Sequence, residues 1–380
     1  MPAASHSADR RRPPEPLPLT VLTGFLGAGK TTLLNRLLKD EALSQTAVII
    51  NEFGDVALDH LMVERIDDEM MVLSSGCLCC TLRGDLVTAL EKLLRGLDNG
   101  RVSFRRVIIE TTGLADPAPI LQTAMSHPYL VMRFRLDGVV TLIDAVNGLS
   151  TLDAHREAVK QAAVADRLVL TKTDLLDTPQ RVATKERLIE RLRDLNPVAP
   201  ILDAARGDAV PAALLQCGLY KAGDKIPDVT AWLAEEAYAA ANAHSHHHHH
   251  DVTRHDDRVR SFSLATDAAI PAAVLDLFLE LLRSMHGPNL LRMKGIVKIE
   301  ETPQTPVVIH GVQHILHPPA RLERWPDADH RSRLVFIVRD IEPRVITELF
   351  DAFLSAPAPG RPDAAALVDN PLVPFGGRDR

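Results

Sequence analysis

A glycine-rich segment near the start of the sequence has the residue types and spacing needed to hold a phosphate group. Residues 24–31 match G-x-x-x-x-G-K-[ST] at every fixed position, between an apolar run and a helical pattern. Glycines let several N–H groups converge on a β-phosphate, while Lys30 reaches the β and γ oxygens and the Thr31 hydroxyl holds Mg²⁺. The segment therefore predicts a nucleoside triphosphate site. Its binding residues are Gly24, Phe25, Leu26, Gly27, Ala28, Gly29, Lys30, Thr31 and Thr32.

A second nucleotide signal follows the apolar run at residues 168–170. The tetrapeptide there is Thr171-Lys172-Thr173-Asp174. An aspartate held at a strand end can accept both the ring N–H and the exocyclic amino group of guanine, a pair of donors that adenine lacks. The aliphatic stem of Lys172 can lie along the base. Together with the phosphate loop, Thr171, Lys172 and Asp174 favour GTP over ATP.

An acidic residue at the end of another apolar run completes the nucleotide signals. Glu110 follows residues 107–109 and is followed by Thr-Thr-Gly. Its carboxylate can bind Mg²⁺ through water, and the N–H of Gly113 can reach the γ-phosphate. The candidate catalytic set is Lys30, Thr31 and Glu110. Because no Gln or Arg is identified that would position the hydrolytic water, we expect slow intrinsic turnover, accelerated by metal or by a partner protein.

Three of the four cysteines are crowded together. Thiolates at Cys77, Cys79 and Cys80 can converge on one metal ion if the chain bends there, as the neighbouring Gly76 and Thr81 permit. Three sulfur ligands leave one tetrahedral position vacant, and this suits pick-up and release of a metal better than permanent structural support. A redox-sensitive cluster and an inert buried cluster stay open as alternatives.

The histidines give weaker signals. His244 and the run at residues 246–250 can buffer zinc, cobalt or nickel, or can form a solvated linker. His310 and His314 share one face of an expected strand, where a structural role is favoured over a ligand role. Cys217 is interpreted as a core residue.

Length and composition indicate the class of protein. The chain has 380 residues, above the roughly 250 to 300 at which one hydrophobic core stops growing, so two domains are expected. It is 46% hydrophobic and 24% charged with a net charge of −7, and this balance does not support nucleic-acid binding. No apolar stretch approaches the roughly 18 residues of a membrane span, and the start lacks a signal-peptide core. We expect a cytoplasmic protein with no membrane partner.

Strand-like runs alternate with helical patterns through the first half of the chain, and this alternation predicts the fold class. The prediction is an α/β fold, a P-loop NTPase parallel sheet with helices on both faces, plus a smaller C-terminal α+β domain. Strands are expected in the second domain at residues 259–264, 296–300, 307–317 and 334–338. The expected divisions are 1–16 (disordered N-terminus), 17–236 (nucleotide-binding domain with the cysteine motif), 237–257 (His-rich linker), 258–355 (α+β domain) and 356–380 (flexible tail).

Several motifs together resemble one family. The segments GFLGAGKTTLLNRLL, NEFGDVALD, SSGCLCCTLRGDL, ETTGLADP and TKTDL occur in this order and spacing. They resemble the CobW family of P-loop GTPases, metallochaperone-like relatives of the urease and hydrogenase nickel-insertion GTPases. Residues 292–295, 310–314 and 325–326 resemble the family's C-terminal module. The likeness covers roughly residues 17–355, and Gly-Cys-Leu-Cys-Cys is its most distinctive part.

The resemblance implies a GTPase that binds a transition metal, most often Zn²⁺ and in some members Co²⁺, and passes it to a client protein. Asp55 matches an acidic position that helps to bind metal in some relatives. Those relatives can carry a second acid where this chain has Ile50. The segment 51–59 is interpreted as a switch whose order depends on the γ-phosphate. Expected partners are GTP or GDP, the metal ion and a client, with homo-oligomerisation left open.

Other functions stay open at this level. Cobalt supply for cobalamin synthesis is the alternative within the same class. A GTP-dependent regulatory or assembly factor would carry no metal, and a small-molecule kinase would need a phosphate-acceptor site, which the sequence does not display. The segment 203–207 resembles the last base-contacting loop of GTPases, and no specific contact is assigned to it.

Overall fold

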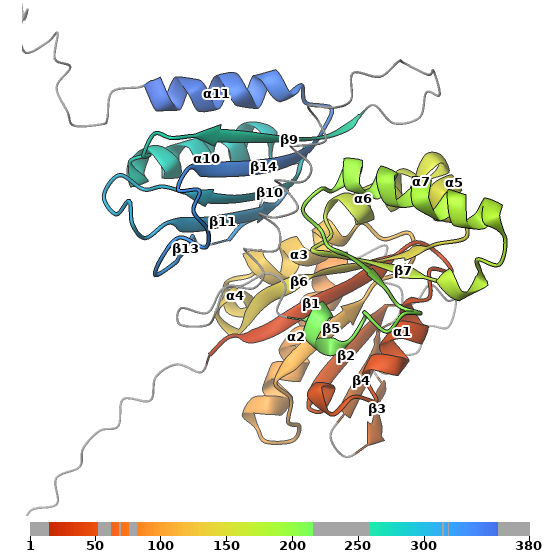
Figure 1. Ribbon diagram of the computed structural model, residues 1–380. Helices are drawn as coiled ribbons and strands as arrows, with labels where there is room; N and C mark the ends of the chain where they lie inside the picture. The colour runs from red at the N-terminus through yellow and green to blue at the C-terminus, as the bar shows by residue number, and fades with distance from the viewer. Residues whose placement is uncertain are drawn as a thin grey trace, which may run out of the picture. The chain divides into compact units, whose positions relative to one another are not determined.

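The computed structural model describes residues 15–51, 62–67, 70–75, 82–215, 258–313, 315–317 and 319–355. The chain divides into two compact units. The first contains residues 1–190 and 199–219, and the second contains residues 191–198 and 220–380. Each unit is built around its own β-sheet (Figure 1).

A twisted sheet forms the centre of the first unit. Its order among the described residues is β3-β4-β2-β5-β1-β6-β7-β8, parallel from β4 to β8, with β3 antiparallel at one edge. The strands are β1 (Leu17–Gly24), β2 (Thr46–Asn51), β3 (Met62–Asp67), β4 (Met70–Ser75), β5 (Arg106–Glu110), β6 (Phe134–Asp144), β7 (Arg167–Thr171) and β8 (Ile201–Asp203). Because neighbouring strands run the same way, the loops after β5, β1, β6 and β7 meet at one edge.

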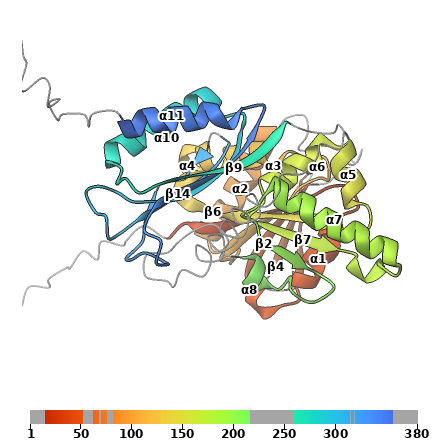
Figure 2. The same cartoon turned by 45° about the horizontal axis from the view of Figure 1, so that its top comes forward.

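Helices cover both faces of this sheet, as Figures 1 and 2 show. They are α1 (Lys30–Leu37), α2 (Leu82–Asp98), α3 (Pro117–Ser126), α4 (Pro128–Arg133), α5 (Gly148–Ala154), α6 (Arg156–Ala163), α7 (Pro179–Leu195) and α8 (Pro211–Leu214), with short 3₁₀ turns η1 (Glu41–Leu43) and η2 (Thr173–Leu175). Leu34 of α1 packs on Leu22 and Val140 on one face. Helices α3 and α6 contact β1 from the other face. Burial on both faces explains why the strands are near-continuous apolar runs.

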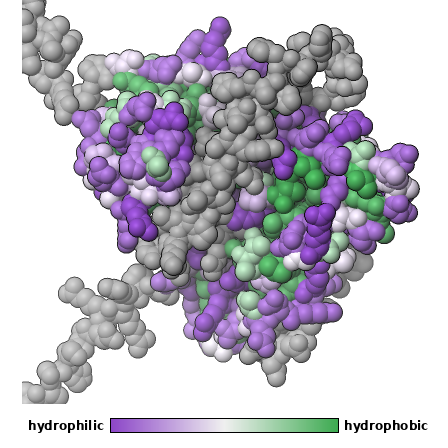
Figure 3. Space-filling model, in the orientation of Figure 1, coloured by the Kyte–Doolittle hydropathy of each residue, from purple (hydrophilic) through white to green (hydrophobic). Residues whose placement is uncertain are grey.

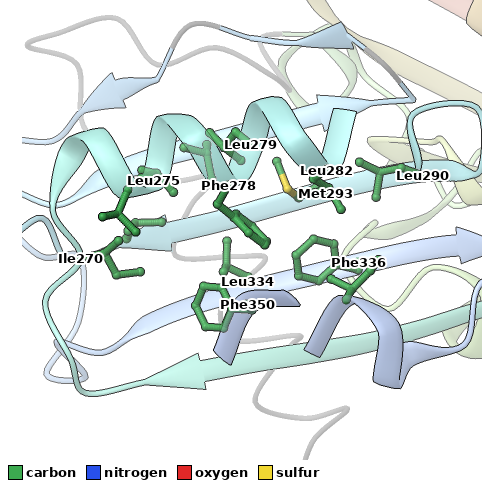
Figure 4. Close-up of a cluster of buried hydrophobic side chains, with 14 of the residues drawn as sticks. Ile270, Leu275, Phe278, Leu279, Leu282, Leu290, Met293, Leu334, Phe336 and Phe350 are labelled. Atoms are coloured by element: carbon green, nitrogen blue, oxygen red, sulfur yellow. The ribbon is translucent and has the colours of Figure 1, made fainter. Parts of the chain in front are cut away.

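The second unit is an antiparallel sheet with helices on one face. Its order is β12-β11-β10-β14-β9, with β13 paired to β11. The elements are β9 (Val259–Thr266), α10 (Ala272–His286), β10 (Leu290–Val297), β11 (Val307–Val312), β12 (Ile315–Leu316), β13 (Ala320–Arg321), β14 (Ser332–Arg339) and α11 (Pro343–Ser355). Phe278 of α10 and Phe350 of α11 meet edge to face over Met293 and Phe336 of the sheet (Figure 4). This cluster is the core of the unit.

The expected fold class is confirmed, while several strand limits in the second unit differ from those expected. The strand expected at residues 296–300 begins earlier in the structure, at Leu290. Arg292 and Lys294 interrupt the apolar pattern of the sequence and hide this start, although both side chains are buried. The single strand expected at residues 307–317 is two short strands, and the chain reverses near Gln313, whose φ is +53°.

On the face drawn in Figure 3, hydrophilic side chains predominate and apolar ones gather in a few areas. Two large exposed apolar side chains, Leu26 and Leu114, belong to the loops after β1 and β5. Single exposed apolar residues are ordinary in globular proteins. What distinguishes Leu26 and Leu114 is that both lie in loops at the same edge of the sheet.

Candidate nucleotide-binding site

The loop after β1 has the backbone shape that its glycines predict. Gly24, Gly27 and Gly29 have φ values of +147°, +72° and +86°, in the region that favours glycine. A Cβ at Gly24 would lie 2.6 Å from the carbonyl oxygen of Leu142 on neighbouring β6, so no other residue fits there. Gly29 precedes the first residue of α1, which places the N–H groups of a helix N-terminus at the loop.

Lys30 folds back over this loop. Its Nζ donates to the carbonyl oxygens of Gly24 at 2.9 Å and Phe25 at 3.2 Å. Burial lowers the pKa of Lys30, and the nearby carboxylate of Glu110 opposes that change. An ammonium group that loses hydration on burial gains the most from a strongly anionic ligand. The geometry therefore suits a phosphate chain lying across the loop.

Thr31 and Glu110 come together although 79 positions separate them. The Thr31 hydroxyl donates to Glu110 Oε1 at 2.7 Å, and Glu110 is buried at the end of β5. Thr31 and Thr32 are exposed at the start of α1. A hydroxyl beside a carboxylate supplies the hard oxygen donors that Mg²⁺ prefers, so these two residues fit that ion.

The loop after β5 lies against the phosphate loop. A Cβ at Gly113 would be 2.5 Å from the backbone nitrogen of Leu26, closer than real Cβ contacts. Thr111 also joins the loops, since its hydroxyl donates to the Thr23 hydroxyl at 2.8 Å. Gln161 of α6 holds this loop from the other side, because its amide donates to the carbonyl oxygen of Gly113 at 3.1 Å. Gly113 is thus fixed against the phosphate loop.

Each of the first three residues in the Thr171–Asp174 tetrapeptide is bound to a different part of the sheet edge. The Thr171 hydroxyl donates to the carbonyl oxygen of Ala28 in the phosphate loop at 2.8 Å. Lys172 Nζ pairs with Asp144 at the end of β6 at 2.7 Å. The Thr173 hydroxyl donates to Asp203 at the end of β8 at 2.5 Å. Asp174 is exposed, so its carboxylate is accessible to a ligand.

Asp203 organises the loop that follows β8. Its carboxylate accepts from the N–H of Ala205 at 3.1 Å and from Lys185 Nζ at 3.1 Å. Burial raises the pKa of Asp203, but hydrogen bonds from Thr173 and Lys185 outweigh burial and leave the pKa below its usual value. Arg36 of α1 donates to the carbonyl oxygen of Ala204 at 2.8 Å. The loop at 203–207 therefore joins the phosphate-loop helix to the tetrapeptide.

The predicted transition-metal ligands are not among the described residues. Cys77, Cys79, Cys80 and Asp55 fall outside the described residues, as do Cys217, His244, His314 and residues 246–250. Within the described residues, no group of three or more His, Cys, Asp or Glu side chains is placed to hold a metal. His310 is buried on β11 with its ring centroid 4.2 Å from that of His317.

Sequence reasoning missed three residues of this site, Asp144, Gln161 and His155, and it named the segment of Asp203 without assigning a contact to it. Asp144, Gln161 and Asp203 bind the loops from elements distant in sequence. His155 stacks on Phe25 with ring centroids 4.5 Å apart. A carboxylate directly after an apolar strand was a usable signal for Asp144 and Asp203. Gln161 and His155 lie on or beside a helix and have no local signature.

The fold and site define a P-loop nucleotide-binding protein, since a glycine-rich strand–loop–helix meets a strand-end acid and a base-side tetrapeptide at one sheet edge. Residues 18–203 match the family model described as CobW/HypB/UreG, nucleotide-binding domain, and residues 259–354 match the cobalamin synthesis protein cobW C-terminal domain. The chain belongs to the CobW family.

Relatives support this assignment over most of the length. The chain is 34% identical over 323 residues to the zinc chaperone YjiA of Escherichia coli (strain K12), covering 85% of this chain and 94% of that protein. It is 30% identical over 317 residues to the zinc chaperone CobW of Sinorhizobium sp, covering 76% and 83%. The crystal structure of Zn(II)-bound YjiA GTPase from E. coli aligns with a TM-score of 0.64 at 29% identity, covering 90% and 99%. No helix in the described part of this chain has the length and apolar character of a membrane span.

Proposed function

We propose that this protein binds and hydrolyses GTP and carries a transition metal, most consistently zinc, to a client protein. The observation that carries the nucleotide part is the bond from the Thr171 hydroxyl to the Ala28 carbonyl oxygen. It joins the tetrapeptide to the phosphate loop, and this supports a single ligand whose purine base and phosphate chain would reach both segments. The names of the relatives, two of them zinc chaperones, support the metal part.

The chain's own groups divide the work of hydrolysis. Loop N–H groups and Lys30 bind the phosphate oxygens, where charge shifts as the terminal phosphate leaves. Thr31 and Glu110 would hold Mg²⁺, which would supply positive charge to the phosphate chain. Gly113 presents its N–H from a loop fixed by Gln161. No residue is assigned to position the water, in keeping with slow intrinsic turnover.

The metal is the cargo in this proposal. Thiolates at Cys77, Cys79 and Cys80 bind it and leave one tetrahedral position, which Asp55 of the segment 51–59 can occupy in exchange with a ligand of the client. If the γ-phosphate orders that segment, metal affinity differs between the GTP and GDP states. Linkage then requires that nucleotide affinity differ between metal states by the same factor.

Asp174→Asn should change the base that the protein prefers. An Asn amide cannot accept from both guanine donors, but it can donate to the 2-oxo group of xanthine. Because the charged acceptor for both guanine donors is lost, GTP affinity should fall about 100-fold while XTP binds the variant more tightly than GTP does. Titration of both nucleotides against both proteins measures this. A wild-type protein that binds ATP as tightly as GTP would contradict the assignment of the base site.

Changing Cys77, Cys79 and Cys80 together to Ser should remove tight zinc binding. Hydroxyl groups do not replace thiolates at a zinc site, so Zn²⁺ affinity should fall by at least about 10³-fold in competition with a chelator of known affinity. The control is Cys217→Ser, which we expect to retain zinc. Zinc affinity of the triple variant equal to wild type would instead favour a GTP-dependent factor that carries no metal at these cysteines.

A further inference from the structure

Asp144 has a fixed carboxylate at the sheet edge, between the phosphate loop and the tetrapeptide. Its Oδ1 accepts from the backbone N–H of Val146 at 2.8 Å and of Asn147 at 3.2 Å, and its Oδ2 accepts from the Asn147 side-chain amide at 3.2 Å. These bonds form a local turn that fixes the carboxylate directly after β6. Burial raises the pKa of Asp144, but the bonds from Lys172, Val146 and Asn147 bring it below its usual value, so the group is an anion at neutral pH.

Lys172 reaches this carboxylate from the neighbouring strand. Its Nζ lies 2.7 Å from Asp144 Oδ2, and the two side chains are 36% and 12% exposed, so the pair is screened from solvent on the aspartate side. The backbone of Lys172 is left-handed with a φ of +58°, an arrangement that is unusual for a residue with a side chain. The backbone of Lys172 is fixed after β7 and its Nζ is fixed at Asp144 after β6. The aliphatic stem of Lys172 therefore runs along the sheet edge from β7 to β6.

Asp174, which is exposed, lies two residues after Lys172 in the chain. A base whose edge is bound by Asp174 would have its flat face next to the stem of Lys172, because Lys172 directly precedes the short 3₁₀ turn η2 that contains Asp174. The stem gives the base an apolar wall only while its end is anchored. Without the anion at Asp144, the ammonium group is drawn into solvent and the wall becomes mobile.

We propose that Asp144 is a positioning residue for the nucleotide base, acting through Lys172 and not through the phosphates. This inference rests on the proposed function and deepens it, since it states how the same site separates recognition of the base from recognition of the phosphate chain. Asp144 itself does not contact the nucleotide.

The test compares a ligand with a base and a ligand without one. Asp144→Asn keeps the turn, because the Asn oxygen still accepts from the N–H of Val146 and Asn147, but removes the charge that holds Lys172. GTP affinity should fall about three- to tenfold, the range expected for a partly buried ion pair. Affinity for inorganic tripolyphosphate should not change. In a Lys172→Met background, Asp144→Asn should produce no further loss of GTP affinity.

A matched control is Asp98→Asn. Asp98 forms an ion pair with Arg133 that is also 2.7 Å long, and Arg133 directly precedes β6, so the pair lies at the opposite edge of the sheet. This variant should bind GTP as wild type does. If Asp144→Asn melts at a lower temperature, Asp144→Ser serves instead, since its hydroxyl also accepts from the turn N–H groups.

Three outcomes would overturn the inference. They are unchanged GTP affinity in Asp144→Asn, an equal loss for tripolyphosphate, and a loss that persists in the Lys172→Met background. Failure of the proposed function is distinguishable from all three, because the wild-type protein would then bind tripolyphosphate and GTP equally or would not bind GTP.

Discussion

Lys30→Ala should lower the rate of GTP hydrolysis by about 10²- to 10³-fold, the loss found when one charge-stabilising donor is removed from an active site. Lys30 is the cation held over the phosphate loop, and its burial means that little water competes for its charge. Single-turnover hydrolysis with saturating Mg²⁺ measures the effect. The same variant should bind GTP more weakly, which an equilibrium titration reports separately.

The fold should survive this change. Lys30 occupies the first position of α1, where alanine is a better helix former, and the apolar face of α1 is untouched. We expect a melting temperature close to that of the wild type. Lys39→Ala is the control, because Lys39 is exposed just beyond the end of α1. If Lys30→Ala hydrolyses GTP within tenfold of wild type, Lys30 does not stabilise the transferring phosphate.

Gly113→Ala should produce the second large effect. Its new Cβ would lie 2.5 Å from the nitrogen and 2.7 Å from the Cα of Leu26, and backbone atoms cannot rotate away as a side chain can. The loop after β5 must then shift from the phosphate loop, and a displacement of about 1 Å can cost about 100-fold in rate. GTP hydrolysis should fall by that order, while GDP, which has no γ-phosphate, should bind almost normally.

The matched control for this prediction is Gly100→Ala. Gly100 has a φ of +65° and no heavy atom within 4 Å of the new Cβ, so it tests backbone strain without a clash. It should lower the free energy of unfolding by about 1 to 2 kcal/mol and leave the hydrolysis rate unchanged. Equal hydrolysis by Gly113→Ala and the wild type would show that this loop does not approach the γ-phosphate.

Some parts of the site are predictable from sequence because their spacing encodes local backbone geometry. Gly24, Gly27 and Gly29 have the positive φ values that a phosphate loop requires, and Glu110 follows an apolar run that becomes β5. The alternation of apolar runs and helical patterns predicted the parallel sheet correctly. The metal and catalytic roles of the predicted residues stay predictions.

Other parts depend on which strands become neighbours, and spacing along the chain does not contain that information. Asp144 meets Lys172 only because β6 and β7 pair in parallel with residues 144 and 171 in register. Gln161 reaches Gly113 across 48 positions, and a glutamine in an amphipathic helix looks like a surface residue. The start of β10 was not predicted because Arg292 and Lys294 are buried in it, and charged residues are rarely buried.

The bond between Thr171 and Ala28 has a consequence for nucleotide exchange. Both partners are protein groups, so this part of the site stands by itself, and neither of these two loops must fold when the nucleotide associates. A preformed site loses little conformational entropy on capture, and differences in affinity between nucleotides then arise mainly in how fast each departs. A partner that speeds replacement of GDP by GTP would therefore act by separating these two loops and breaking the Thr171–Ala28 bond. It would not need to supply a missing part of the site.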